Sequence, residues 1–504
     1  MARSAPGVFV KMPLLKFGAW TPDTADFEAT SVKNILNVVP RADGYGPFPS
    51  FSAYTSALAG ACRGAFYAVK NDGTVITFAA TATKLYKLNN TDFTWTDVSK
   101  GSSTYTAPTF LSSPANWHFA QTGNLVWATQ ANTVLQVFDL TSSTNFADAA
   151  GSPPQAAYIA VVGRFLVLSG LASTPYRIQW SGLNNFNASN SWTSGTQQSD
   201  FQDFPDGGAV RGVAGGDQSG VIFQDQAIRR MAYVGSPIVF QIDRIADQVG
   251  LYASDSIVRA GQTVLYYSTK GFQKIEPGGA PTPIGRERVD RTFGGDLDKG
   301  NLQLFMGASD PRTTRVYWAY KSNSGQTGIY DKILGYDTTL DQFFPLSVSG
   351  EYLLGMSQTG LTLENLDTIS SSIDALTLSL DAYATAVQPE IAQFNSSHVL
   401  GFFRGTNLEA TIESGEQGDD ENRMSLRGFR PVTDAAALYG SVEYRDTQQA
   451  STNTTSETAI STRTGRVDIR RDARYQRFKL RVPAATTWTF CAGVVPDVST
   501  GAAL

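Results

Sequence analysis

Three aspartates, Asp290, Asp296 and Asp298, form a compact acidic set in a long segment at residues 276–300. Two carboxylates close together act as acid and base, or as acid and nucleophile, in glycoside hydrolysis, so these side chains are the candidates for cleaving a glycan. The basic residues of the same segment are Arg286, Arg288, Arg291 and Lys299. Salt bridges within the segment explain the aspartates without catalysis. We therefore predict no catalytic residue here and keep glycan cleavage as an alternative.

Other residue types that carry chemistry are sparse. The two histidines, His118 and His398, lie far apart, and the sequence places no partners for a Ser-His-Asp triad or a zinc site beside them. Residues 215–220 are rich in glycine but lack the Lys-Ser/Thr that ends a phosphate-binding loop. The acidic run at 419–421 lacks the spacing of an EF-hand. We predict no enzyme activity, no metal and no cofactor.

The last hundred residues contain a charge contrast. An acidic segment at 409–421 is followed by a basic one at 463–481, and on a strand at 475–482 the basic side chains would share one face. Three interpretations stay open: a solvated sheet face, complementary contact between subunits of a ring, and contact with DNA. The signal for DNA is weak because the basic strands lack aromatic stacking partners for the bases. The second gives our candidate subunit interface. Its residues are Arg470, Arg471, Arg474, Arg477, Lys479, Arg481, Glu409, Glu413, Glu416, Asp419, Asp420 and Glu421.

A recurring unit predicts the strands in the first two thirds of the chain. Its clearest copies, 73–97 and 123–148, each contain a glycine, an alternating strand, a small polar turn and a second alternating strand. Alternating β-branched and aromatic residues between short turns are typical of hairpins, and a period of about 40–50 residues indicates the blade of a β-propeller. Looser copies bring the count to six, within a range of five to seven. The anchors of the second strands are Leu85, Leu135, Ile178, Ile228, Phe272 and Ile333.

Length and composition predict an all-β chain of several domains. The chain has 504 residues, 46 of them glycine, with 11% aromatic and 17% charged residues. We predict an N-terminal arm at 1–50, which either closes the propeller ring with a strand or packs on a neighbour, and a β-propeller at 51–355. A connector at 356–389 follows. Its apolar residues recur every three or four positions over 361–382, which favours an amphipathic helix, although part of it also alternates like a strand. Residues 390–504 read as a β-sandwich or jelly-roll-like domain.

Net charge, cysteine content and apolar segments indicate which partners and which compartment the chain has. The net charge of −5 gives no global basic surface for tight nucleic-acid binding. The two cysteines, Cys62 and Cys491, give no disulfide framework. The amino terminus lacks the apolar core of a signal peptide, and no apolar run has membrane-spanning length, so we predict synthesis in the cytoplasm without stable membrane insertion.

Several short patterns carry a resemblance to a known family. They are Asn34-x-x-Asn37-x-x-Pro40 before a Gly-rich turn, Thr83-Lys-Leu-Tyr86 with Trp95-Thr-Asp97, Arg177-Ile-Gln-Trp180 with Trp192, and Gln248-Val-Gly250-Leu with Gly271-Phe272. Spread over residues 15–355, these patterns resemble the tail nozzle proteins of short-tailed bacteriophages, also called tail tubular or packaged-DNA stabilisation proteins. The connector and the C-terminal module do not match that family residue by residue.

The resemblance implies a non-enzymatic β-propeller subunit of a homohexameric ring in the virion tail, made in the cytoplasm of a bacterial host. The ring would lie below the portal and adaptor proteins, which would be its partners together with tail fibre, spike or needle proteins. Double-stranded DNA would be retained and then ejected through the ring without sequence-specific binding. A charge every ~1.7 Å along DNA would bind a basic wall and slow ejection, so we expect a neutral or acidic one.

Two other function classes remain. One is a glycan-binding or glycan-cleaving propeller with a C-terminal carbohydrate module, which would use Asp290–Asp298 or the Trp-containing segment 181–195. The other is a head-completion or baseplate scaffold with no pore.

Overall fold

The computed structural model describes residues 14–25, 31–108, 116–357, 372, 389–418 and 420–500. Within these residues the chain is built from antiparallel β-strands, and the one α-helix is α1 (Asp290–Asp296). Short 3-10 turns occur at η1 (Lys100–Ser102), η2 (Pro205–Gly207), η3 (Ser254–Ser256) and η4 (Leu302–Leu304). The predicted all-β class is confirmed.

In the described part of the chain, seven sheets have four antiparallel strands each. The first three are β6 (Gly64–Val69), β7 (Val75–Ala80), β8 (Leu85–Leu88), β9 (Trp95–Asp97); β10 (His118–Thr122), β11 (Leu125–Thr129), β12 (Gln136–Asp139), β13 (Ala147–Asp148); and β14 (Ala156–Val162), β15 (Phe165–Leu171), β16 (Arg177–Trp180), β17 (Asp200–Asp203). The next three are β18 (Val210–Ala214), β19 (Ser219–Gln224), β20 (Ala227–Tyr233), β21 (Phe240–Asp247); β22 (Val258–Ala260), β23 (Thr263–Ser268), β24 (Gly271–Ile275), β25 (Thr282–Pro283); and β26 (Met306–Ser309), β27 (Arg315–Tyr320), β28 (Lys332–Asp337), β29 (Gln342–Leu346). The seventh is β30 (Tyr352–Ser357), β31 (Pro389–Phe394), β32 (Val399–Asn407) and β5 (Pro49–Ala57).

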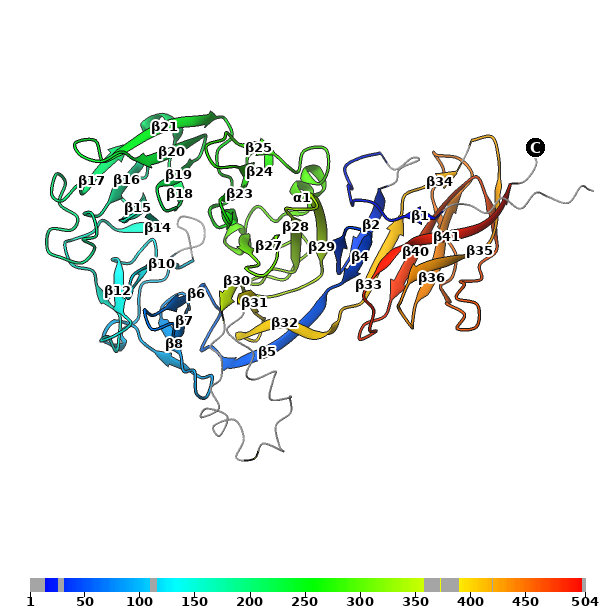
Figure 1. Cartoon of the computed structure of the whole chain (residues 1–504), viewed down its shortest axis with the longest axis horizontal. Helices are drawn as coiled ribbons and strands as arrows, with labels where there is room; N and C mark the ends of the chain where they lie inside the picture. The colour runs from blue at the N-terminus through cyan, green and yellow to red at the C-terminus, as the bar shows by residue number, and fades with distance from the viewer. Residues whose placement is uncertain are drawn as a thin grey trace, which may run out of the picture.

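The seven sheets have a propeller-like arrangement. They follow one another around a common centre in chain order (Figure 1). The first strands of neighbouring sheets contact each other, as β10 does with β14, β26 with β30, and β30 with β6. The seventh sheet joins distant parts of the chain, because β5 pairs with β32 through Gly401↔Ala53 and Phe402↔Ser52. A strand near the amino terminus therefore completes the sheet that lies beside the first one.

The sequence predicts six repeats within a range of five to seven, and the described residues form seven four-stranded sheets. The sheet without a repeat signature is the seventh. Its β30 and β31 are separated by more than thirty residues, and its fourth strand comes from residues 49–57. Strands so far apart in the sequence leave no repeat of fixed period.

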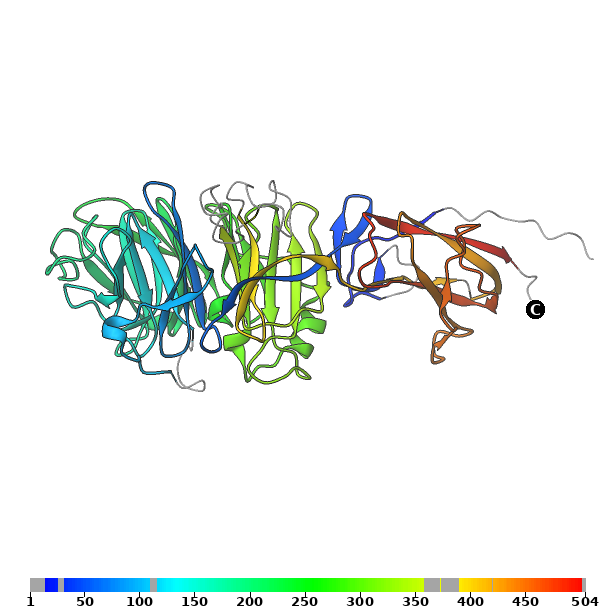
Figure 2. The ribbon, with the colours of Figure 1, turned by 90° about the horizontal axis from the view of Figure 1, so that it is seen from below.

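In the described residues, two larger sheets form the second part of the structure, and they contain strands from both ends of the chain. One contains β3 (Val38–Arg41), β4 (Gly44–Pro47), β41 (Cys491–Thr500), β35 (Met424–Thr433) and β39 (Arg471–Ala473), with β1 (Leu15–Lys16) on β41. The other contains β2 (Val32–Leu36), β33 (Ala410–Ser414), β40 (Tyr475–Val482), β36 (Tyr439–Arg445) and β37 (Asn453–Thr454), with β34 (Gln417–Gly418) on β40 and β38 (Thr458–Ala459) on β36. Phe429 and Phe478, one from each sheet, pack with ring centroids 5.2 Å apart. Figure 2 shows this part beside the propeller-like part, with β5 and β32 running between them.

The strand pairing divides the chain differently from the sequence-based boundaries. Strands β2–β4, from the predicted arm at 1–50, join the two larger sheets. Strands β31 and β32, from the predicted domain at 390–504, complete the sheet of β30 and β5. Pairing between segments hundreds of residues apart decides both placements, and local patterns do not record it. The predicted helix at 361–382 and most of the connector at 356–389 lie outside the described residues.

Candidate functional site

The candidate site is the charged face of three neighbouring strands, β33, β40 and β36. Along β40 the side chains of Phe478, Leu480 and Val482 are buried in the core. Since successive side chains of a strand point to opposite faces, Lys479 and Arg481 lie on the other face, as predicted. The pairing register sets acidic residues beside them, with Glu413 of β33 opposite Lys479.

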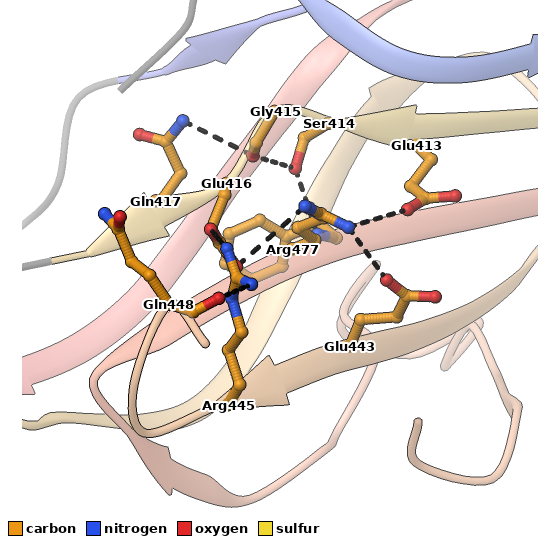
Figure 3. Close-up of polar contacts among 10 residues, drawn as sticks. Glu413, Ser414, Gly415, Glu416, Gln417, Glu443, Arg445, Gln448 and Arg477 are labelled. Atoms are coloured by element: carbon orange, nitrogen blue, oxygen red, sulfur yellow. Dashed lines mark hydrogen bonds and ion pairs between the residues drawn. The ribbon is translucent and has the colours of Figure 1, made fainter. Parts of the chain in front are cut away.

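Arg477 lies at the centre of this face, among three glutamates (Figure 3). Its Nη1 is 3.2 Å from Oε2 of Glu443 and 3.8 Å from Oε1 of Glu413, and its Nη2 is 4.0 Å from Oε1 of Glu416. Arg445 donates from Nε to Oε1 of Glu416 at 2.7 Å. Arg477 is 9% exposed and Glu416 2% exposed, so these charges are largely removed from water. Removing one partner from such a cluster leaves the others without charge balance.

Glu413 is the titrating member of the cluster. Burial and the negative charge of Glu443 raise its pKa to about 7, against the lowering effect of the Arg477 and Lys479 charges. A proton on Glu413 removes its repulsion with the nearby carboxylate of Glu443. The arrangement can therefore take up and release a proton near neutral pH.

Arg481 forms a second, more exposed set of ion pairs on the same face. Its Nη2 donates to Oε2 of Glu457 at 2.6 Å and its Nη1 to Oε2 of Glu409 at 3.1 Å. The guanidinium carbon also lies 4.6 Å from the centre of the Tyr439 ring. These contacts join β40 to the segment before β33, to β36 and to the segment before β38.

The structure brings together only part of the predicted interface. Glu409, Glu413 and Glu416 meet Arg477 and Arg481 within one chain, so the predicted match of acidic with basic residues is made internally at these positions. Asp420 accepts a hydrogen bond from the Tyr475 hydroxyl, Glu421 is exposed, and Asp419 lies outside the described residues. Arg470 and Arg471 lie at the edge of the other sheet, on and beside β39, and Arg474 follows them.

Three partners in these ion pairs were missed from the sequence: Glu443, Arg445 and Glu457. A local signal for two of them exists, because Glu443 and Arg445 alternate with Val442 and Tyr444 along β36. Their proximity to Arg477 depends on the pairing of β36 with β40, which no local pattern gives.

Two of the three aspartates at 290–298 form salt bridges with lysines. Asp296 accepts from Nζ of Lys332 at 2.8 Å, and Asp298 from Nζ of Lys321 at 2.8 Å, which with further hydrogen bonds holds the pKa of Asp298 at about 2. Burial raises the pKa of Asp290 to about 6, and its Oδ1 accepts from the backbone N–H of Phe272. Salt bridges do explain two of these carboxylates. Their partners are these two lysines and not the basic residues of the segment itself.

The segment at 276–300 is partly helical, since α1 begins at Asp290. The carboxylate of Asp23 accepts from the backbone N–H groups of Arg291 and Thr292, at 2.7 and 2.9 Å. A carboxylate that accepts from the first free N–H groups stabilises a helix start. In the predicted aromatic segment 181–195, Trp192 is buried and offers no platform to solvent.

Both histidines contact carboxylates. His118 Nε2 lies 2.8 Å from Oδ1 of Asp255, and His398 Nδ1 lies 2.7 Å from Oε1 of Glu351. Among the described residues, no group of three His, Cys, Asp or Glu side chains could hold a metal ion.

The two cysteines form no disulfide bond with each other. Cys62 and Cys491 are buried free thiols, and burial raises the pKa of each to about 12. In the described part of the chain no helix has the length and apolarity to cross a membrane.

No family model matches the chain, and no curated protein matches it. Among solved structures, U3-55K is similar with 10% identity and a TM-score of 0.37, covering 61% of this chain and 89% of that one. The computationally designed Ika8 protein is similar with 10% identity and a TM-score of 0.36, covering 71% of this chain and 98% of that one. At these TM-scores neither likeness carries an argument about this chain.

Proposed function

We propose that this chain is a structural virion protein: the ring-forming tail nozzle subunit of a short-tailed bacteriophage. In this proposal the ring is a homohexamer below the portal and adaptor, carries tail fibre, spike or needle proteins, and forms the distal DNA conduit. It retains packaged DNA and lets it pass during ejection. The support is the resemblance of the motifs over residues 15–355, together with the structural role of the first of them.

The finer architecture belongs to the same proposal. The seven four-stranded sheets are the blades of one seven-bladed β-propeller, in which β5 closes the last blade. The two larger sheets are a C-terminal β-sandwich that includes the N-terminal strands β2–β4.

The observation that carries the proposal is the position of the motif Asn34-x-x-Asn37-x-x-Pro40. Oδ1 of Asn37 accepts from the backbone N–H of Ser347 at 2.7 Å, and its Nδ2 donates to the carbonyl oxygen of Glu409 at 2.9 Å. One side chain thus links the segment after β29 with the segment before β33. Nη2 of Arg315 donates to the carbonyl oxygen of Pro40 at 3.2 Å.

This motif fastens the propeller-like part to the larger sheets, and the paired strands β5 and β32 connect them a second time. Two connections restrict the relative movement of the two parts, which suits a subunit in the wall of a tube that retains DNA.

The charge distribution is compatible with a conduit. Arg477 and Arg481 would bind DNA phosphates if they faced a pore unpaired. Both are neutralised by glutamates of their own chain. An inter-subunit contact of the kind predicted would therefore depend on the remaining basic residues, such as Lys479 or Arg474.

A glycan-acting propeller remains the second candidate. The observation in its favour is Asp290, whose raised pKa suits an acid and which lines a cavity of about 600 Å³ with Lys270, Gln273, Arg286 and Arg291. A glycan array tests this candidate directly.

Electron microscopy of purified particles, labelled with an antibody against this chain, tests the nozzle. Label confined to the distal end of a short tail supports the proposal, and particles without label overturn it. Light scattering of the purified chain, with a subunit mass of 54.3 kDa, then gives the ring order.

A further inference from the structure

A basic groove lies at the edge of the β3–β4–β41–β35–β39 sheet, apart from the Arg477 cluster. It has a volume of about 650 Å³ and lies between β35 and the edge strand β39. Its lining residues are Ser425, Leu426, Arg427, Arg470, Arg471 and Asp472. The single acid of the groove is already engaged, because Nε of Arg423 donates to Oδ1 of Asp472 at 3.0 Å. The groove therefore has an excess of positive charge.

Arg470 and Arg471 differ from the arginines of this part of the chain that form ion pairs. Arg466 pairs with Asp468 at 2.6 Å and with Asp497 at 2.8 Å, and Arg477 and Arg481 are neutralised as described. Within the described residues, neither Arg470 nor Arg471 makes an ion pair or a side-chain hydrogen bond, and both are exposed. Carboxylates balance Arg466, Arg477 and Arg481, whereas no carboxylate pairs with Arg470 or Arg471 in the described part of the chain.

Arg471 is also held in place by an aromatic ring. Its guanidinium carbon lies 3.8 Å from the centre of the Tyr444 ring. A guanidinium stacked on a ring keeps a fixed plane, while its N–H edge stays available to a bidentate acceptor such as a phosphate. Aromatic rings beside arginines are typical of surfaces that bind nucleic-acid strands, and the sequence alone had shown no such partner.

We propose that this groove binds the phosphate backbone of a nucleic acid through Arg470 and Arg471. The stacked guanidinium of Arg471 takes one phosphate, and Arg470, its neighbour in sequence, takes the same phosphate or the next one. Since only two free cations contribute, the contact is weak, independent of base sequence and sensitive to salt. The site does not depend on the nozzle proposal, because any setting that brings nucleic acid to this edge would use it.

The test is fluorescence anisotropy of the purified full-length protein with short labelled DNA, single-stranded and duplex, over a range of salt concentrations. The wild-type protein should bind more weakly as salt rises. In R470E/R471E the salt slope, the change of log K with log salt concentration, should become shallower by about two, one for each phosphate that an arginine no longer neutralises. Tyr444→Leu, which removes the ring under Arg471, should weaken binding less.

The matched control is Arg463→Glu. Arg463 is exposed, lies in the same part of the chain and is not among the groove residues. It should leave the slope unchanged, and circular dichroism should show all variants folded. Equal loss of binding in Arg463→Glu would overturn the proposal in favour of a net-charge effect.

Three further outcomes also contradict it. Unchanged DNA binding in R470E/R471E rules out the groove as the site. Polyglutamate that competes as well as unlabelled DNA would identify an acidic protein as the partner. Self-association that the double variant abolishes, measured by light scattering without DNA, would identify a second copy of the chain.

Discussion

Glu443 and Arg477 face each other as a registered pair on β36 and β40, with Nη1 of Arg477 3.2 Å from Oε2 of Glu443. Glu413, on the strand at the other side of β40, lies 3.8 Å from the same nitrogen. One guanidinium thus stands between carboxylates of both neighbouring strands. Because this guanidinium is largely buried, the stability of the sheet depends on the protonation of Glu413.

The first prediction concerns pH. Folding raises the pKa of Glu413 from 4.5 to about 7, so between these values the folded chain holds a proton that the unfolded chain has released. The contribution of this group to the free energy of unfolding therefore falls as pH rises from 4.5 to 7, by up to about 3 kcal/mol, and stays low above pH 7. Glu413→Gln removes this titration and imitates the protonated form. Urea unfolding measures the free energy of unfolding of Glu413→Gln minus that of wild type, and this difference should be more favourable to the variant at pH 8 than at pH 5.

The control for this prediction is Glu457→Gln. Hydrogen bonding to Arg481 lowers the pKa of Glu457, so its stabilising contribution is present above its unfolded pKa and is lost as pH falls through the folded one. Glu457→Gln should be destabilising at pH 8. If both variants changed stability with pH in the same direction, the assignment to Glu413 would fail.

The second prediction concerns the loss of the central cation. Arg477→Met leaves Glu413, Glu416 and Glu443 with one fewer positive charge in a largely buried place, and should lower the free energy of unfolding by about 3–5 kcal/mol. Arg481→Met removes pairs whose arginine side chain is 26% exposed, and should cost about 1 kcal/mol or less. Denaturant unfolding at pH 7 measures both. Equal costs for the two variants would show that burial of Arg477 does not matter.

The third prediction concerns Asn37, which links the two parts of the chain. Asn37→Gly removes the side-chain hydrogen bonds to Ser347 and Glu409 and should cost about 1–3 kcal/mol. Asn37→Ala should cost a further 1 kcal/mol or so, because φ is +56° at this position, a conformation that alanine adopts poorly. Limited proteolysis should also cut between the parts faster in both variants. Equal stability of Asn37→Gly and wild type would remove the support that this motif gives to the nozzle proposal.

The local features of this fold could be predicted from the sequence. The alternation of Lys479 and Arg481 with Phe478, Leu480 and Val482 has its cause in the geometry of a single strand, so the predicted faces of β40 are correct. The hairpins of the repeated sheets are local in the same sense, since β7 and β8 pair across one short turn.

Pairings that join remote segments could not be predicted. Nothing near residues 49–57 records that β5 pairs with β32, or that β2 pairs with β33. The candidate site has the same limit. The glutamates and arginines were visible as two charged segments, but their meeting within one chain follows from the order β33–β40–β36. A charge contrast in a sequence shows that opposite charges are present and leaves open whether they meet in one subunit or in two.

The last prediction concerns the amino-terminal segment, which Asp23 ties to the propeller-like part. Its carboxylate accepts from two backbone N–H groups in the first turn of α1 and from the hydroxyl of Thr292 at 2.6 Å. Asp23→Ala leaves these donors without their acceptor and should lower the free energy of unfolding by about 1–2 kcal/mol. Asp43→Ala is the control, since its exposed carboxylate lies 3.8 Å from Arg41 and should contribute less than about 0.5 kcal/mol. Hydrogen exchange should locate the effect of Asp23→Ala at α1. Exchange that is unchanged at α1 would mean that the helix start does not depend on the amino-terminal segment.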